Sequence, residues 1–274
     1  MDRYEEMGRF LRSRRARLSP EELGVRPFGQ RRRVPGLRRE ELGPLAGIGV
    51  DYYTRLEQGR VQNVSVDVLE AIADVLRLNP AEREYVRNLN RPSKLAPPVA
   101  PDSVRPALQH LLDSTPETPA YIIGPLTNVL AWNRIACTLF LDFGALSKAD
   151  RNWAYLLFLH DGIQAMFDDL LKAQRENVAF LRLQTSRYPN ADELSSLVDR
   201  MLADSPFFRE LWEQYEVIDK SHNDYLLHHP VVGDVILNFQ AGRLPNEPGQ
   251  ALITFTPEPD TPSAKALHVL AQAN

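Results

Sequence analysis

Cysteine is nearly missing from this 274-residue sequence, which contains only Cys137. A single thiol excludes a disulfide bond within the chain and any metal site built on paired cysteines. Cys137 lies in an apolar segment, where we expect a buried small side chain rather than a nucleophile or a redox sensor.

Long hydrophobic runs and catalytic motifs are also absent. No 18 consecutive residues are apolar, and the first ten residues lack the apolar stretch of a secretion signal, so we expect a cytoplasmic protein with no membrane contact. There is no HExxH, no GxSxG and no phosphate-binding glycine loop. The sequence therefore predicts no catalytic residues and no enzyme.

Five potential metal ligands do fall within eleven residues: Asp219, His222, Asp224, His228 and His229. In an extended segment, however, His228 and His229 point to opposite faces, and no second ligand pair elsewhere completes a coordination shell. We therefore expect no metal. His229 precedes Pro230 and is interpreted as a turn residue or a hydrogen-bond donor at a ligand pocket.

Lysine does not occur in the first 60 residues, which contain 14 arginines and nine acidic residues, a net charge of +5. The rest of the chain carries a net charge of −9, so the overall value of −4 hides a basic N-terminal end. Clustered arginines neutralise phosphates, and double-stranded DNA is the expected partner of this end. A solvated charged face is the alternative, against which the consecutive Arg31, Arg32 and Arg33 argue.

The segment from Gly36 to Gly59, GLRREELGPLAGIGVDYYTRLEQG, predicts a helix-turn-helix. Its leucines form the apolar side of a first helix over residues 38–46, and Gly47 makes the turn. Gly49 is the expected N-cap of a second helix, which Gly59 ends. A helical hairpin that only packs is the alternative, but the arginine-rich context favours DNA binding.

Prolines mark a domain boundary. The stretch RPSKLAPPVAPDSVRP contains five of them, so we predict a linker at residues 91–104. Before it, helices that start at the caps Asp2, Ser65 and Asn79 complete a mainly α, five-helix domain over residues 1–90.

The sequence after the linker, residues 105–274, predicts an α+β domain. Residues 126–132, 231–239 and 251–256 have the β-branched, near-alternating apolar pattern of strands, and a long helical block lies between the first two. This order favours a small antiparallel sheet with inserted helices on one face.

Several segments together resemble the MmyB-like transcription regulators, a branch of the Xre-type helix-turn-helix proteins. The N-terminal segments are FLRSRRARLSPEELG, RRRVPG and GLRREELGPLAGIGVDYYTRLEQGR; the C-terminal ones are LAWNRIACTLF, FLHDGIQAMF, FRELWEQYEV, HHPVVGDVILNFQ and LPNEPGQALITFTPEPDTPSAKALHVLA. The resemblance implies a PAS-like C-terminal domain that binds a small apolar molecule such as a fatty acid, with no other cofactor. It also implies a homodimer on paired DNA half-sites.

The same resemblance implies a set of DNA contacts. Arg39, at the start of the first helix, is expected to touch the backbone or a base edge, and the second helix is the recognition helix. Asp51 can accept from cytosine, whereas Arg55 can instead pair with Glu57 or Glu41. The predicted contacts are Arg31, Arg32, Arg33, Arg38, Arg39, Val50, Asp51, Thr54, Arg55 and Arg60.

The motif departs from similar sequences at three positions. Pro44 inside the first helix should kink or shorten it, at about 3 kcal/mol unless the helix ends early. Gly43 is also unusual there, and Gly49 in place of serine costs a few tenths of a kcal/mol. These departures support an alternative, a protein-interaction scaffold that retains the motif without binding DNA. We expect a ligand-responsive, DNA-binding transcriptional regulator.

Candidate ligand contacts come from three features of the C-terminal domain. Its many aromatic side chains either line a cavity or simply form the core. Arg175 and Arg182 share a helix face, where they either hold a ligand carboxylate, form structural ion pairs or snorkel. Asn133 is either a polar group at a pocket mouth or a helix N-cap. The predicted contacts are Trp132, Asn133, Phe140, Phe158, Arg175, Val178, Arg182, His229 and Phe239.

Overall fold

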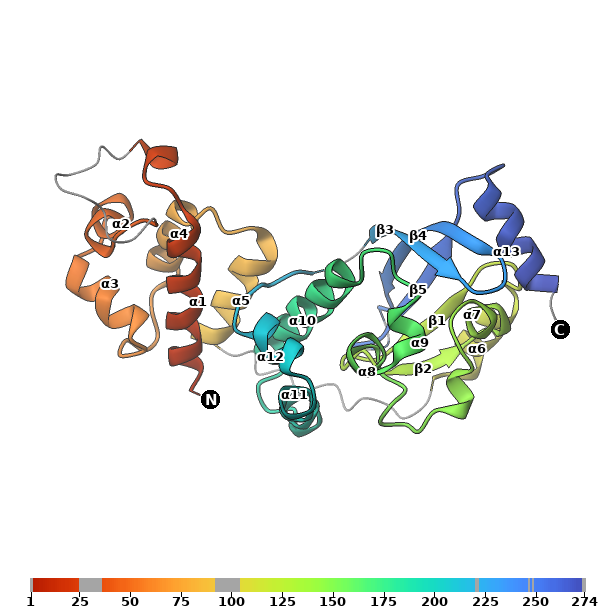
Figure 1. Cartoon of the computed structure of the whole chain (residues 1–274). Helices are drawn as coiled ribbons and strands as arrows, with labels where there is room; N and C mark the ends of the chain where they lie inside the picture. The colour runs from red at the N-terminus through yellow and green to blue at the C-terminus, as the bar shows by residue number, and fades with distance from the viewer. Residues whose placement is uncertain are drawn as a thin grey trace.

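The computed structural model of the chain describes residues 2–24, 36–91, 104–219, 222–245, 247 and 249–272. A helical N-terminal domain lies beside a C-terminal domain that contains the sheet (Figure 1). Nearly all of the predicted linker at residues 91–104 lies outside the described residues.

The described part of the N-terminal domain contains the five predicted helices and one short 3-10 turn. Asp2 caps the first helix by accepting a hydrogen bond from the Tyr4 amide at 2.7 Å, and Asn79 and Glu82 form a reciprocal capping box. The elements are α1 (Arg3–Arg17), η1 (Glu21–Leu23), α2 (Arg39–Leu45), α3 (Val50–Glu57), α4 (Val66–Val75) and α5 (Pro80–Asn90).

Close backbone packing fixes α1 against α3. A Cβ atom at Gly8 of α1 would lie 2.4 Å from the carbonyl oxygen of Glu57, so only glycine allows this approach. The packed faces bury an apolar core whose fully inaccessible members include Met7, Phe10, Leu11, Leu37, Leu42, Tyr53 and Leu56.

The C-terminal domain is α+β, as predicted. Its elements are α6 (Pro106–Asp113), β1 (Ala120–Ile123), β2 (Val129–Trp132), α7 (Arg134–Leu139), η2 (Phe143–Ala145), α8 (Trp153–Leu159), α9 (Asp161–Gln164), α10 (Leu170–Arg187), α11 (Asp192–Asp204), α12 (Pro206–Trp212), β3 (His222–His229), β4 (Gly233–Arg243), β5 (Ala251–Thr256) and α13 (Pro262–Gln272).

All strand pairs in the sheet are antiparallel, and the strand order is β2-β1-β5-β4-β3. The helices α7 to α12 are inserted between β2 and β3. The strands β2, β4 and β5 match the three predicted segments, whereas β1 and β3 were not predicted. The four residues of β1 are too few for alternation to be recognised, and polar side chains interrupt the apolar pattern of β3.

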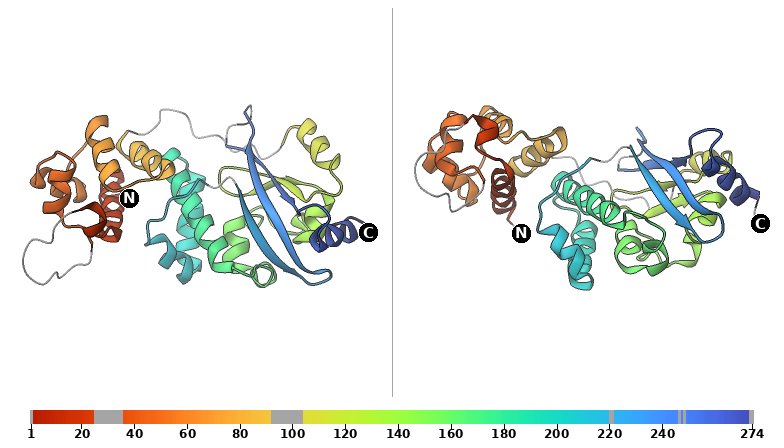
Figure 2. Two further views of the ribbon diagram at one scale, coloured as in Figure 1. Left: turned by 90° about the horizontal axis from the view of Figure 1, so that it is seen from above. Right: turned by 45° about the horizontal axis from the view of Figure 1, so that its top comes forward.

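The helix α10 lies between the N-terminal domain and the sheet (Figure 2). Leu183 of α10 is fully buried in the same hydrophobic cluster as the N-terminal core, together with Val217. One apolar core therefore continues from the N-terminal domain into α10.

A buried arginine joins the two domains at this interface. The guanidinium of Arg182, on α10, is fully inaccessible and pairs with Glu6 of α1 and with the carbonyl oxygen of Trp212. It also lies 4.1 Å from the ring centroid of Trp212 and 4.5 Å from that of Tyr215. Glu6 accepts a second hydrogen bond from Tyr85 of α5, at 2.6 Å.

Candidate DNA interface and ligand cavity

The helices α2 and α3 form the predicted helix-turn-helix. Gly47, with φ of +65°, makes the turn, and the extended Gly49 is the N-cap of α3. Gly59 follows α3 with φ of +71° and ends it. The three glycines thus have the positions and roles that the sequence predicts.

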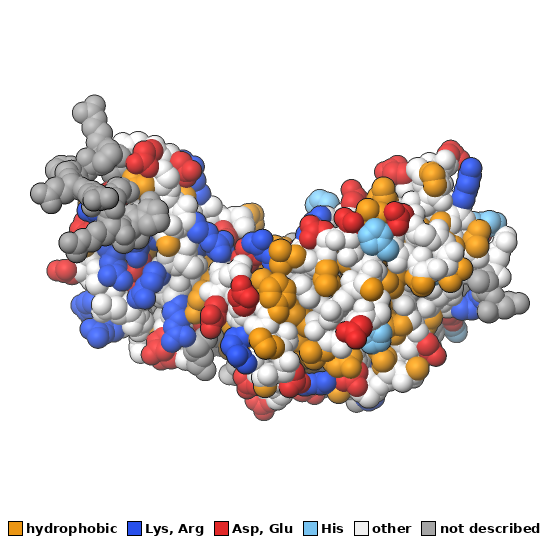
Figure 3. Space-filling model, in the orientation of Figure 1, with side chains coloured by type: hydrophobic (Ala, Val, Ile, Leu, Met, Phe, Trp, Pro, Cys, Tyr) orange, Lys and Arg blue, Asp and Glu red, His pale blue; other side chains and the backbone are white. Residues whose placement is uncertain are grey.

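The predicted base and phosphate contacts on this motif differ in exposure. Asp51, Arg55 and Arg60 are exposed, whereas Arg38, Arg39, Val50 and Thr54 are half-buried. Basic side chains gather over the N-terminal domain on the face seen in Figure 3. Their contact with DNA stays a prediction, and Arg31, Arg32 and Arg33 lie outside the described residues.

Glu57, at the end of α3, binds an arginine of α1 and an arginine of α2. Its carboxylate accepts hydrogen bonds from Arg15 Nε at 2.6 Å and from Arg39 Nε at 2.7 Å. Arg12 Nε lies 3.8 Å from Glu57 Oε2. Because Arg15 also donates to the carbonyl oxygen of Leu37 at 2.6 Å, the cluster ties α1, α2 and α3 together.

The charge of this carboxylate is stabilised in the fold. Burial raises the pKa of Glu57, but the hydrogen bond and charge of Arg15, with the hydrogen bond of Arg39, outweigh burial and hold the pKa below its usual value. Arg39 is therefore held at the surface of the motif by the hydrogen bond from its Nε to Glu57. Its position at the start of α2 depends on Glu57 rather than on DNA.

Pro44 lies in the last turn of α2, which ends one residue later at Leu45. Its missing amide hydrogen therefore falls where the helix is already closing, as expected for a shortened helix. The chain continues through hydrogen bonds from Ile48 N to the Gly43 carbonyl oxygen at 2.9 Å and from Gly47 N to the Pro44 carbonyl oxygen at 3.1 Å. Gly43 lets α3 approach, because a Cβ there would lie 3.2 Å from Val50 Cγ2.

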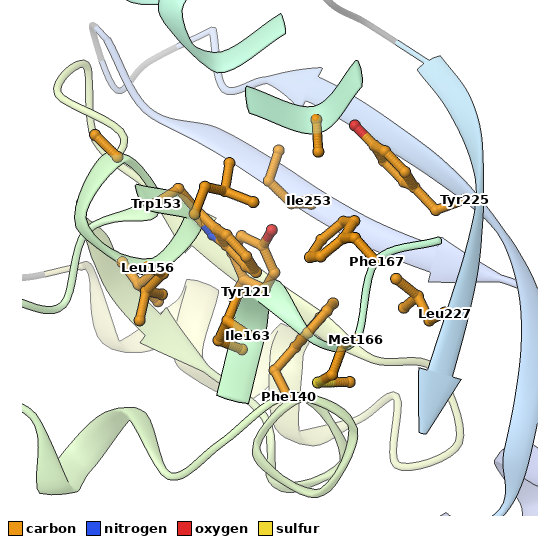
Figure 4. Close-up of a cluster of buried hydrophobic side chains, with 14 of the residues drawn as sticks. Tyr121, Phe140, Trp153, Leu156, Ile163, Met166, Phe167, Tyr225, Leu227 and Ile253 are labelled. Atoms are coloured by element: carbon orange, nitrogen blue, oxygen red, sulfur yellow. The ribbon is translucent and has the colours of Figure 1, made fainter. Parts of the chain in front are cut away.

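In the C-terminal domain, a cavity of about 640 Å³ lies between the sheet and α10. Alternate residues of the strands face it, as the two-residue period of a strand requires, and the buried side chains around it include Tyr121, Trp153, Phe167, Tyr225 and Ile253 (Figure 4). Its wall also includes Leu157, Ala173, Glu176, Asn177, Phe180, Gln184, Arg187, Asp219, Phe239, Ala241, Arg243, Gln250 and Phe255.

A few polar groups interrupt the apolar wall. Glu176 accepts hydrogen bonds from the Tyr225 hydroxyl at 2.7 Å and from Asn223 Nδ2 at 2.6 Å, which fixes α10 to β3. Gln250 is 2% exposed, and neither of its side-chain polar atoms has a hydrogen-bond partner among the described residues. Asn177 Oδ1 is also buried and unpartnered there.

Of the predicted ligand contacts, Phe239 borders the cavity. Val178 is buried in the core, and Phe140 packs edge-on against Trp153 and Phe255. Phe158 packs against Phe208 of α12. These side chains form the core, which was the alternative for the aromatic residues.

The polar candidates have structural roles that the sequence analysis gave as alternatives. Asn133 Oδ1 accepts hydrogen bonds from the amides of Ala120 and Ala136, so this residue is the N-cap of α7 and a link to β1. The ring of His229 bonds the Thr138 carbonyl oxygen at 3.0 Å and the amides of Val231 and Val232, which makes it a turn residue.

Three remaining candidates also lie outside the cavity wall. Arg182 belongs to the domain interface, and Arg175 pairs with Glu216 at 2.6 Å on the surface. The third candidate, Trp132, has its ring centroid 4.8 Å from the guanidinium of Arg151. Arg175 and Arg182 share one face of α10, as their seven-residue spacing predicts, but neither side chain borders the cavity.

Two of the five potential metal ligands, His228 and Asp219, have separate partners. His228 bonds Asp234 and Asp168, whereas Asp219 pairs with Arg187 and Arg243. Within the described residues, no group of three or more His, Cys, Asp or Glu side chains is arranged to hold a metal ion. Nor is any helix in that part of the chain long and apolar enough to cross a membrane.

A helix-turn-helix joined to an α+β domain with an apolar cavity defines a DNA-binding regulator with a ligand-binding domain. Comparison with family models agrees: residues 6–86 match a helix-turn-helix domain, and residues 104–270 match the MmyB-like transcription regulator ligand binding domain. The chain belongs to this family of MmyB-like regulators. No curated protein matches the chain in sequence.

Proposed function

We propose that the cavity binds a small, mostly apolar molecule such as a fatty acid. The observation that carries the proposal is the cavity itself. Its volume is about 640 Å³, and its wall is built largely from aromatic and aliphatic side chains. That volume falls within the range of roughly 300–1,000 Å³ typical of small-molecule sites. The order of the strands and the helices inserted between β2 and β3 support a PAS-like domain.

Mass spectrometry of the denatured, purified protein tests this ligand class. We expect a fatty acid or a similar lipid at a stoichiometric level. A protein that carries no small molecule and takes up no added long-chain fatty acid contradicts the proposal.

We also propose that the protein acts in the cytoplasm as a homodimer that binds specific operator sequences. Regulators with this motif bind paired half-sites about one helical turn, roughly 34 Å, apart. The exposed side chains of α3, Asp51 and Arg55, support base contacts, and Arg39 and Arg60 support backbone contacts. Ligand binding then selects one arrangement of the domains across the proline-rich linker and changes the affinity for paired sites.

Titration of DNA from upstream of the protein's own gene tests this part. Arg39→Ala is expected to weaken binding about tenfold, because a side chain that bonds DNA contributes about 1–3 kcal/mol. The fold should survive, since Glu57 keeps its 2.6 Å bond to Arg15. Arg175→Ala, in the C-terminal domain, is the matched control and should bind as the wild type does. Unchanged affinity of Arg39→Ala at moderate salt contradicts its assignment.

The scaffold alternative makes a different prediction for the same titration. A degenerate motif should show no salt-dependent binding to any DNA. If that result is obtained, Pro44→Ala is the first substitution to test, because Pro44 is the main departure within the motif. Equal DNA affinity with and without bound ligand would instead contradict the regulatory proposal.

A further inference from the structure

Arg187, at the end of α10, belongs both to the cavity wall and to the domain interface. Its side chain is 13% exposed and borders the cavity. Its guanidinium is held by Glu84 of α5, with Nε 2.7 Å from Oε1 and an Nη 2.9 Å from Oε2. The same Nη lies 3.0 Å from Asp219. One side chain therefore touches the cavity and a carboxylate of the DNA-binding domain.

The polarity of the cavity changes along its length. In the sheet, Phe239 of β4 is opposite Phe255 of β5. Four residues further along, at one end of β5, Ala251 is opposite both Arg243 of β4 and Ile123 of β1. Along α10, the lining residues run from Ala173 through Phe180 to Gln184 and Arg187, a rise of about 21 Å at 1.5 Å per residue. One end is thus aromatic, and the other carries two arginines.

Unsatisfied polar atoms lie at the arginine end. Gln250 directly precedes Ala251, and its buried amide has no hydrogen-bond partner among the described residues. A buried amide without a partner is costly, so its presence here points to a polar ligand atom. Asp219 joins Arg187 to Arg243, with an Nη of Arg243 2.5 Å from its Oδ2, so both guanidinium groups converge on one carboxylate.

We propose that a ligand carboxylate binds at this end, accepts hydrogen bonds from Arg187, Arg243 and Gln250, and replaces Glu84 on Arg187. The inference rests on the proposed binding of an apolar, fatty-acid-like ligand, whose chain would occupy the aromatic end. Because Glu84 loses its partner, ligand binding weakens the contact between α5 and α10. The Arg182–Glu6 contact does not border the cavity, so the domains stay joined there while the contact at Arg187 opens.

Two probes of equal chain length separate the head group from the chain. Dodecanoate and dodecanol are titrated by calorimetry into the full-length protein after bound lipid has been stripped. Wild type is expected to bind dodecanoate about tenfold more tightly, since a hydrogen bond to a charged group contributes more than a neutral one. Arg187→Gln is expected to lose this preference while keeping its affinity for dodecanol.

Removal of the competing carboxylate tests the exchange itself. If the ligand displaces Glu84, linkage requires that Glu84 in turn weakens the binding of the ligand. Glu84→Gln should therefore bind dodecanoate several-fold more tightly than the wild type, and its affinity for dodecanol should be unchanged. The matched control is Glu70→Gln, which removes a carboxylate that pairs with Arg83 within the N-terminal domain. This control should bind both probes as the wild type does.

Hydrogen exchange of α5 provides a readout that a merely structural role of Arg187 would not move. Dodecanoate, but not dodecanol, should speed exchange in residues 80–90 of wild type, and Glu84→Gln should exchange fast with either probe.

Each contrary result has a distinct meaning. If Arg187→Gln binds dodecanoate as tightly as the wild type, the head group lies elsewhere and the inference is wrong, although the proposed apolar ligand stands. If Arg187→Gln loses the preference but Glu84→Gln is unchanged, the exchange with Glu84 is refuted. If neither dodecanoate nor dodecanol binds the wild type or any variant, the proposed fatty-acid-like ligand and this inference are both wrong.

Discussion

Arg182→Met tests whether the buried ion pair holds the two domains together. The methionine keeps most of the aliphatic stem but leaves Glu6, which is 7% exposed, without its cationic partner. Breaking a buried pair by removing one partner costs about 3–5 kcal/mol. The Tyr85 hydroxyl still donates to Glu6 at 2.6 Å, so we expect a loss near the lower end, about 3 kcal/mol.

The double variant separates the pair from the packing around it. With Glu6→Met and Arg182→Met together, neither charge of this pair is left buried alone, and apolar replacements of similar length are often close to neutral. The double variant should therefore be more stable than Arg182→Met alone, with a coupling free energy of about 2–3 kcal/mol.

Urea unfolding followed by tryptophan fluorescence measures these free energies. The Trp212 ring, 4.1 Å from the Arg182 guanidinium, reports directly on the interface. Arg175→Met is the matched control on the same helix, because its pair with Glu216 is exposed and should contribute less than about 1 kcal/mol. A loss below about 1 kcal/mol for Arg182→Met, additive with Glu6→Met, refutes the reasoning.

Three further predictions concern pH and capping. The depressed pKa of Glu57 gives stability that is present at neutral pH and lost as the pH falls below about 4.5, so urea unfolding across pH should show this loss in wild type and less of it in Glu57→Gln. The hydrogen bond to Asp234 raises the pKa of His228 above 6.5, so its NMR titration midpoint should lie above that value and fall in Asp234→Asn, and its contribution to stability should disappear as the pH rises through the midpoint. Gly49→Ser should raise the free energy of unfolding by a few tenths of a kcal/mol, whereas Ser65→Ala should lower it by about 1 kcal/mol; no change in the Ser65→Ala variant contradicts the capping hydrogen bond to Val68.

The N-terminal domain could be predicted from sequence because its signals are local. Asp2, Ser65 and Asn79 cap the helices they precede, and each cap acts within three residues of itself. Gly47 adopts the positive φ that a tight turn requires. The role of Glu57 was missed, because its partners Arg15 and Arg39 are distant in sequence and no short-range pattern relates them.

The ligand cavity could not be located from sequence, because periodicity assigns a face to a helix without naming its neighbour. Arg175 and Arg182 share a stripe of α10, but the cavity is bordered by a different stripe that includes Glu176, Phe180 and Arg187. Both stripes mix charged and apolar side chains, so neither identifies itself as a cavity wall. The pairing of distant strands decides which stripe faces a cavity.

Adjacent residues on α10 face different parts of the molecule. Leu183 is packed in the core shared with the N-terminal domain, and Gln184 borders the cavity. Because packed interiors do not deform continuously, a ligand that displaces one of these side chains must move the helix as a unit or leave it in place. Movement of α10 would carry Arg182 and the carboxylate of Glu6 that it holds, while the contact of Arg187 with Glu84 is the one that the proposed ligand opens. Coupling between ligand and DNA therefore needs no long pathway through the fold, since the cavity and the DNA-binding domain lie on two sides of one helix about 10 Å thick.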